Sequence, residues 1–109
     1  MLKKEFRLNK RKDFEEIKTK GKLKNGELFS VLELKKGQEG LLSVKVAVIV
    51  SKKISKKAVE RNKIRRKMYL MIGKNMNIFP EGARILFLVK KNILNKSEAE
   101  MEKCLKKLF

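Results

Sequence analysis

Hydrophobic residues recur along the chain with two different periods, and the changes of period predict where helices and strands lie. Spacings of three and four residues predict helices over about 10–20, 56–72 and from 98 to the end. Alternating or continuous apolar residues predict strands at 28–36, 44–50 and 84–90, after a short extended segment at 22–25. This order, α-β-β-β-α-β-α, predicts an α+β fold: a two-layer sandwich in which helices pack against a small, mostly antiparallel sheet.

The strand segments differ in how their apolar residues are distributed over the two faces. In 28–36, the alternation places Leu28, Leu32 and Leu34 on one face, with Phe29 and Val31 on the other. In 44–50, valine occupies every second position, and Ala47 and Ile49 fill the opposite side. Apolar residues on both faces are typical of strands that are covered on both sides, so we expect 44–50 and 84–90 to be central in the sheet.

Several residues with special backbone roles mark the ends of the predicted helices. Asn9 is a suitable cap for the first helix and Gly21 a suitable end, and Phe14 and Ile17 supply its apolar stripe. Two glycines predict a turn at 36–40. Ser97 and Glu100 form a capping box that opens the last helix. The buried face of that helix is predicted to consist of Met101, Cys104, Leu105 and Leu108.

Composition indicates one domain, spanning 1–109, with a polyanionic partner. The chain has 30 Lys and Arg against 12 Asp and Glu, a net charge of +18, which favours nucleic acid. The basic residues are not confined to one amphipathic helix, which argues against a membrane surface. There is no apolar run of about 20 residues that could span a membrane, and no apolar signal-peptide stretch. We therefore expect a cytoplasmic protein.

The chain offers few groups for catalysis by its own side chains. It has no histidine and a single cysteine, Cys104, which nearly excludes a zinc site. Its carboxylates are scattered, and no close pair suggests a two-metal centre. Cys104 lies on the apolar side of the last predicted helix, where we expect it to be a small buried hydrophobe.

The most informative stretch is 50–66, which contains many basic residues and a single acidic residue, Glu60. Helical geometry places Ile64, Met68, Met71 and Ile72 on one core face, while Lys63, Arg66 and Lys67 lie on the opposite side. We therefore expect the second half of this helix to pack on the sheet and the first half to project as a basic surface. A solvated charged helix is the bland interpretation, but one glutamate cannot pair with so many cations.

These residues closely resemble the arginine-rich signature of the protein subunit of bacterial ribonuclease P. In that family a strand leads to Val-x-Lys-Lys, and a helix then carries Arg-Asn-Arg-x-Lys-Arg. The matching segments here are Val50-Ser51-Lys52-Lys53 and Arg61-Asn62-Lys63-Ile64-Arg65-Arg66. Arg7-Leu8, Asp13-Phe14 and Gly21 resemble the opening helix of the family. The chain departs from the family pattern at Lys63, Tyr69, Lys18 and Leu32.

The resemblance implies a function in precursor tRNA processing. Ribonuclease P removes the 5′ leader, and its RNA subunit holds the Mg²⁺ ions and performs the hydrolysis. The protein subunit binds that RNA and the leader. The residues implied to bind the catalytic RNA are Arg61, Asn62, Lys63, Arg65 and Arg66, with Lys52 and Lys53 as further candidates. The cleft between the first helix and the sheet, implied to bind the leader, would include Phe14, Lys10 and Lys18. Phe14 is equally well explained as a core aromatic residue.

Three alternatives stay open at the level of sequence. A small basic ribosomal protein has the same composition, and co-purification with ribosomal subunits would identify it. A DNA-binding or nucleoid protein is less favoured, because no helix-turn-helix pair or dimerisation stripe is visible. A stand-alone nuclease would need activity without RNA.

Overall fold

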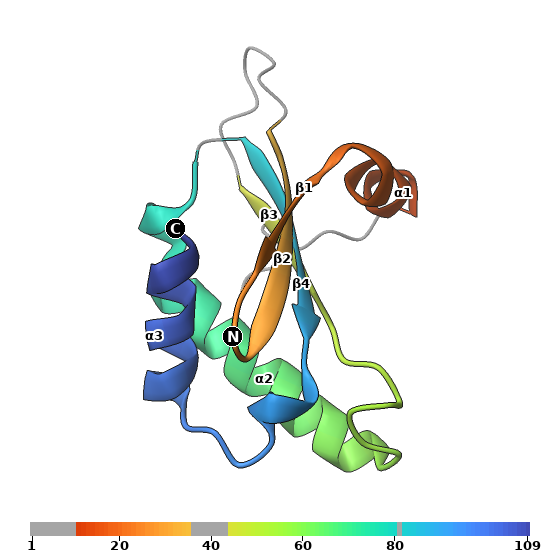
Figure 1. Cartoon of the computed structure of the whole chain (residues 1–109), viewed down its shortest axis with the longest axis vertical. Coiled ribbons are helices and arrows are strands. Elements are labelled where there is room, and N and C mark those ends of the chain that lie inside the picture. Colours follow the sequence, from red (N-terminus) through yellow and green to blue (C-terminus); the bar gives the residue numbers. More distant parts are fainter. Residues whose placement is uncertain (1–10, 36–43, 81) are drawn as a thin grey trace.

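The computed structural model describes residues 11–35, 44–80 and 82–109, and it has the predicted order of elements (Figure 1). The helices are α1 (Arg11–Lys20), α2 (Ala58–Lys74) and α3 (Glu98–Leu108). The strands are β1 (Lys22–Asn25), β2 (Phe29–Lys35), β3 (Lys45–Ile49) and β4 (Ala83–Val89). Single 3-10 turns, η2 (Met76–Ile78) and η3 (Lys91–Ile93), follow α2 and β4. The α+β fold class is confirmed, whereas Asn9 and the turn at 36–40 lie outside the described residues.

The sheet has the strand order β1-β2-β4-β3. β2 pairs antiparallel with both β1 and β4, and β3 pairs parallel with β4, so the sheet is mostly antiparallel as predicted. The central position of β4 is also confirmed. The prediction that 44–50 is central was wrong, because β3 lies at an edge. Both faces of β3 carry apolar residues because helices cover both faces of the sheet there. This pattern does not depend on having a neighbouring strand along each edge.

Helices cover the two faces of the sheet unequally. α2 and α3 lie on one face, and α1 crosses one end of the other (Figure 1). The larger core between the sheet and α2 and α3 contains Phe29, Val46, Phe87, Met68 and Leu105, among others. Ile64, Met68, Met71 and Ile72 are the buried residues of α2, which confirms the predicted core face.

A smaller apolar cluster holds α1 on the opposite face. Ile17 is fully buried against Ala47 and Leu86, and Phe14 packs against this cluster while remaining partly exposed. A helix of ten residues is marginal in isolation. Burial of a side chain such as Ile17 contributes about 1.5–3 kcal/mol, so α1 depends on these contacts to remain in place.

Leu28 does not share a face with Leu32 and Leu34, and this part of the prediction was wrong. It belongs to the larger core together with Phe29 and Val31, whereas Leu32 and Leu34 pack against the smaller cluster. The reason is that β2 begins at Phe29, so the alternation of a strand does not extend to Leu28.

Polar contacts join the end of α2 to α3. The Asn75 side chain is buried and donates from Nδ2 to the Met71 carbonyl at 2.8 Å and to Glu102 Oε2 at 3.2 Å. The hydrogen bond from Asn75, with help from Lys106, lowers the pKa of the Glu102 carboxyl. Lys74 lies 2.9 Å from Glu98, and this hydrogen-bonded pairing raises the pKa of Lys74.

The predicted capping box and buried stripe of α3 are also present. Ser97 Oγ accepts from the Glu100 backbone N–H at 3.2 Å, as a helix cap does. Met101, Cys104 and Leu105 are buried, and Leu108 is partly buried. Within the described ranges, no helix is long and apolar enough to cross a membrane.

Candidate nucleic-acid interface

The predicted basic residues come from two connected pieces, the first half of α2 and the segment 50–57 that precedes it. Arg61 ties the two pieces together, because its Nη1 donates to the Ser55 carbonyl at 2.8 Å. Ile54 is buried in the larger core and anchors the segment from below. Lys52 and Lys53 are exposed on this anchored segment. A loop fixed in this way presents its cations in a defined position.

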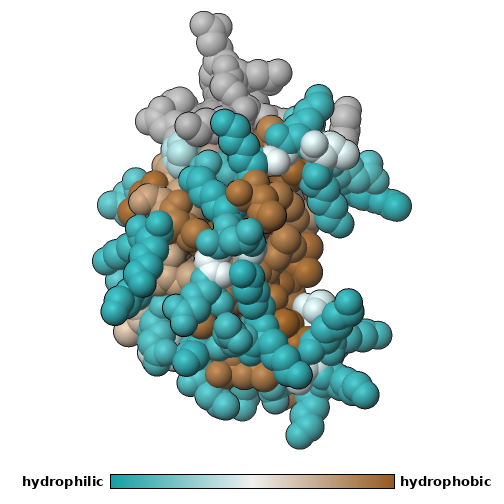
Figure 2. Space-filling view, viewed as in Figure 1, coloured by the Kyte–Doolittle hydropathy of each residue, from teal (hydrophilic) through white to brown (hydrophobic). Residues whose placement is uncertain are grey.

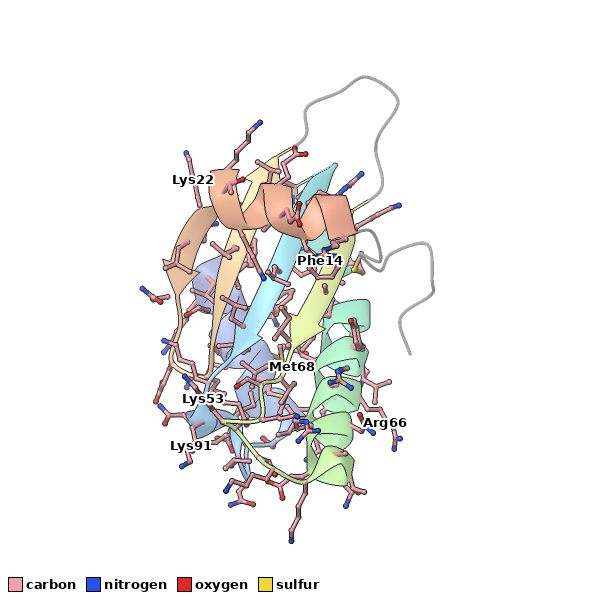
Figure 3. All side chains as sticks on the ribbon, turned by 90° about the vertical axis from the view of Figure 1, so that its right-hand side faces the viewer. Phe14, Lys22, Lys53, Arg66, Met68 and Lys91 are labelled. Carbon is pink, nitrogen blue, oxygen red and sulfur yellow. The ribbon has the colours of Figure 1, made fainter. Side chains whose placement is uncertain are left out.

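The motif on α2 divides between two flanks of the helix. Arg65 Nη1 donates to Asn62 Oδ1 at 2.8 Å, on the flank of α2 that also carries Arg61. Asn62 thus uses its carbonyl for Arg65 and keeps its amide N–H groups for other acceptors. Arg66 points outward and is exposed (Figure 3). Lys63 and Lys67 lie on the other flank, toward α3, and not opposite the core face as predicted, so the structure does not bring all five motif residues onto one face.

The cations of this surface have no carboxylate partners in the described part of the chain. The ion pairs among the described residues lie elsewhere: Arg11–Glu15, Lys24–Glu33, Lys74–Glu98, Lys96–Glu100 and Lys106–Glu102. Uncompensated cations that project from a rigid helix attract a polyanion and release its counterions on binding. A helix stabilised by mutually paired charges therefore does not fit this arrangement, and a binding measurement distinguishes a nucleic-acid surface from a solvated charged helix.

An apolar region remains open on the sheet face that α1 only partly covers. It is formed by the half-buried side chains of Leu32, Leu34, Ile49 and Leu88, and by Leu23, which is 56% exposed. Figure 2 shows a hollow with a hydrophobic floor at the right-hand edge, between two groups of hydrophilic side chains. Apolar surface flanked by cations suits the stacking of unpaired bases with their phosphates held at the sides.

Two of the predicted leader-cleft residues, Phe14 and Lys18, belong to α1, the helix that borders this open face. Phe14 lies under α1, where it packs on the sheet (Figure 3). Lys18 is exposed in the last turn of α1. Lys10 lies outside the described residues. The structure therefore gives Phe14 a packing role and leaves part of its surface free, so stacking on a base stays a prediction.

Sequence reasoning missed two lysines at the other end of the sheet. Lys90 Nζ donates to the Gly26 carbonyl at 2.6 Å, which ties the end of β4 to the β1–β2 turn. Lys91 is exposed and lies with Lys53 near the lower end of the sheet in Figure 3. The sequence contained a signal for them: the pair Lys90-Lys91 directly follows a strongly apolar strand, and side chains at the end of a strand are commonly exposed.

Tyr69, one of the departures from the family pattern, has a structural role. Its hydroxyl accepts a hydrogen bond from the Val48 backbone N–H at 3.3 Å. Because β3 is an edge strand, that N–H has no strand partner on its outer side. The tyrosine thus covers part of the open edge.

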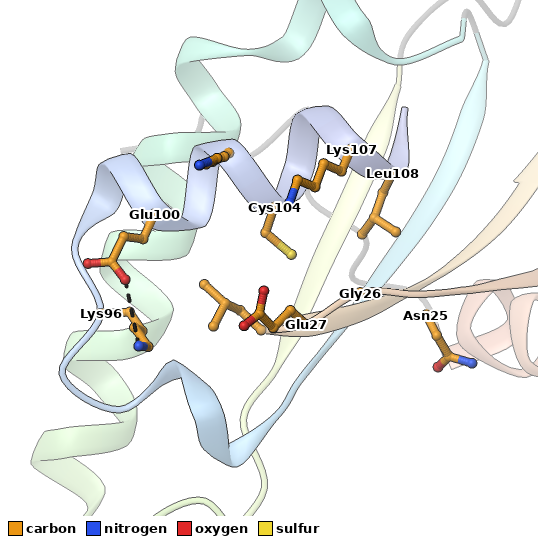
Figure 4. A pocket seen from close by; sticks show the side chains of 10 residues that line it. Asn25, Gly26, Glu27, Lys96, Glu100, Cys104, Lys107 and Leu108 are labelled. Atoms are coloured by element: carbon orange, nitrogen blue, oxygen red, sulfur yellow. Dashed lines mark ion pairs between the residues drawn. The ribbon is translucent and has the colours of Figure 1, made fainter.

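A second groove lies between α3 and the β1–β2 turn (Figure 4). It has a volume of about 370 Å³, and Cys104 lies at its base. Its rim mixes both charges, and one ion pair, Lys96–Glu100 at 3.7 Å, lies at its edge. No group of three His, Cys, Asp or Glu among the described residues could hold a metal ion.

Comparison with known proteins agrees with this geometry. A family model described as Ribonuclease P matches residues 2–109. The ribonuclease P protein component of Desulfosudis oleivorans is 35% identical over 108 residues, which cover 99% of this chain and 86% of the relative. The ribonuclease P protein component of a Synechococcus species is 31% identical over 96 residues, which cover 86% of this chain and 71% of the relative.

Solved structures of the same family have this fold. The RNase P protein from Thermotoga maritima superposes with a TM-score of 0.81 at 27% identity, over 94% of this chain and 93% of the other. The Staphylococcus aureus RNase P protein superposes with a TM-score of 0.80 at 21% identity, over 94% of this chain and 91% of the other. The second likeness supports the fold alone.

Proposed function

The chain belongs to the ribonuclease P protein family, and we propose that it binds the catalytic RNA of ribonuclease P and the 5′ leader of precursor tRNA. In this role it assists the endonucleolytic removal of the leader, which leaves the mature 5′ end of the tRNA. The net charge of +18 lets one small protein hold two polyanions together and reduce their mutual repulsion.

One observation carries the proposal: the family signature lies on a projecting half-helix whose cations lack carboxylate partners among the described residues. Arg61, Asn62, Lys63, Arg65 and Arg66 are assigned to the catalytic RNA, with Lys52 and Lys53 beside them. Arginine forks suit bidentate phosphate contacts, and the Asn62 amide suits ribose or a base edge. The hydrogen bond from Arg61 to Ser55 holds both pieces in one orientation, which supports their action as a unit.

The open sheet face is assigned to the leader. Its apolar floor is bounded by α1 at one end and by the segment that carries Lys53 at the other (Figure 3). A single strand laid across it would stack bases on Leu32, Leu88 or the free part of Phe14, while Lys18 meets its phosphates. Because apolar contacts dominate, leader binding should depend less on salt than binding of the catalytic RNA.

The hydrolysis itself is assigned to the RNA subunit and its Mg²⁺ ions. The donor set of this chain does not fit a protein metal centre, since it has no histidine and no cluster of three ligands among the described residues. The ions belong to the RNA in this proposal, and the protein contributes by screening phosphate repulsion near them. A cytoplasmic location follows from this role.

The decisive experiment is precursor tRNA cleavage with the cognate RNA subunit at low magnesium, with and without the protein. We expect the protein to restore removal of the leader and to have no activity alone. The variant with Arg61→Ala and Arg65→Ala should lose most of this effect. If the wild-type protein has no effect with a cognate RNA, the proposal fails and the ribosomal alternative takes its place. Cleavage by the protein without RNA would instead identify a stand-alone nuclease.

A further inference from the structure

We propose that the groove between α2 and the turn before α3 binds an unpaired nucleotide of the RNA that α2 contacts. This α2–α3 groove has a volume of about 380 Å³, within the range of roughly 300–1,000 Å³ that small-ligand sites occupy. It lies on the flank of α2 opposite to Arg61 and Arg65. The inference rests on the proposed function, and it adds a second RNA-contacting surface, which includes Lys67 from beyond the six-residue motif.

The walls of the α2–α3 groove combine cations with an apolar floor. Lys63 and Lys67 line it from α2, one turn apart and both exposed. Neither has an ion-pair partner in the described ranges. Lys96 lines the other side and pairs with Glu100 at 3.7 Å, which leaves it partly neutralised. The groove therefore presents its free positive charge mainly from α2.

The apolar surface that a base could contact comes mainly from half-buried Leu94, while Ile64, Ile93 and Met101 also line the groove but are almost fully buried. A site for phosphate alone would not need such a floor, whereas a base buries its flat face on apolar side chains. The combination favours a nucleotide over a free anion.

Asn95 provides a polar group at the rim of the groove. It is exposed and has a backbone φ of 65°, in the left-handed region that asparagine tolerates better than most residues. Its amide can both donate and accept, as recognition of a base edge requires. Glu60 also lines the groove and repels phosphate at its end of the wall. The phosphate is therefore expected near Lys67, away from Glu60.

Salt-dependent binding of the cognate RNA subunit tests this proposal with a matched control. The groove variant carries Lys63→Gln and Lys67→Gln. The control carries Lys103→Gln and Lys107→Gln, two exposed lysines on α3 that line the groove of Figure 4 instead. Both variants lose the same net charge, and neither removes a buried group. Loss of the phosphate contact at Lys67, and of a second contact if Lys63 meets the neighbouring phosphate, should reduce the log–log salt slope by about 0.7–1.4 in the groove variant, with little change in the control.

A second variant separates base recognition from charge. Asn95→Gly keeps the left-handed backbone accessible while removing the amide. We expect it to weaken RNA binding by about fivefold without changing the salt slope. Lysine acylation of the complex gives a readout without substitution: Lys63 and Lys67 should be protected by RNA, and Lys103 and Lys107 should not.

The outcomes distinguish the inference from the proposed function. If Arg61→Ala with Arg65→Ala weakens binding while the groove variant behaves like the control, the groove is not an RNA site and Lys63 is removed from the assigned contacts, but the rest of the proposed function stands. Unprotected Lys63 and Lys67 in the bound protein would overturn the inference in the same way. If the wild-type protein does not bind the RNA subunit, both are refuted.

Discussion

Arg61 provides the sharpest test of how the basic surface is organised, because it belongs to the family signature and also holds the preceding segment. Its Nη1 donates to the Ser55 carbonyl at 2.8 Å, across the junction between the segment 50–57 and α2. Arg66 is exposed, and its side chain makes no hydrogen bond or ion pair within the described residues. Arg61→Ala and Arg66→Ala therefore remove the same charge from the same helix but differ in their structural effect.

The expected loss of folding stability follows from the hydrogen bond. A bond from a charged donor contributes about 1.5–3 kcal/mol when its partner is buried, and less when water can replace the donor. Because this contact is only partly buried, we expect Arg61→Ala to lower the free energy of unfolding by about 1 kcal/mol. That corresponds to roughly 4 °C in Tm for a chain of this size. Arg66→Ala should change stability by less than about 0.5 kcal/mol.

RNA binding should separate the two variants further. Arg66→Ala removes one phosphate contact, which reduces the salt slope by about 0.7–0.9. Arg61→Ala also frees the segment that carries Lys52 and Lys53, so its slope should fall by up to roughly 2. Urea unfolding and binding titrations over a salt series measure both quantities. Equal stability and equal salt slopes in the two variants would show that Arg61 is not an anchor and would refute this reasoning.

Three other predictions concern packing and titration. Phe14→Ala should destabilise the protein by about 2 kcal/mol in urea unfolding, because Phe14 and Ile17 are the apolar side chains through which α1 packs on this cluster. Phe14→Leu should restore stability, and if it also restores full affinity for leader-bearing tRNA, stacking by Phe14 is excluded. Gly26→Ala should be destabilising, because a Cβ atom there would lie 2.5 Å from the Phe29 carbonyl oxygen; an unchanged urea midpoint would contradict this. The pKa of Glu102 is lowered, mainly by Asn75, so its contribution to stability is present above its ordinary pKa of 4.5 and is lost as pH falls through its lower folded-state value. The free energy of unfolding should therefore fall less between about pH 6 and about pH 3 in Asn75→Ala than in the wild-type protein. An equal fall in the two proteins would rule out this linkage.

Local patterns in the sequence were sufficient for the elements and for the identity of the basic surface. The core face of α2, the capping box at Ser97 and the seven-element order depend on spacing within short segments, which the chain carries without reference to its fold. The same is true of the motif from Arg61 to Arg66, because its residues are close in sequence. The family comparison supports the interpretation of that motif.

Strand neighbours could not be predicted in the same way. Valines on one side of 44–50 and Ala47 and Ile49 on the other show that both faces are covered, but they do not show what covers them. Helices on both sides produce the same pattern as a central position, and the structure places β3 at the edge. Tyr69, which the sequence showed only as a departure from the family pattern, covers that edge because α2 lies beside it.

What the sequence determined by itself is the kind of surface: a basic half-helix of the ribonuclease P protein family on a small α+β domain. What only the tertiary structure decided is how that surface is divided and joined. The way α2 packs on the sheet places Lys63 on one flank of the helix and Arg61 and Arg65 on the other. The hydrogen bond between Arg61 and Ser55 fixes the segment that carries Lys52 and Lys53. The α2–α3 groove exists because α3 returns beside α2 after a strand and two turns. These contacts join residues that are distant in sequence, and their geometry depends on the packing of the whole core.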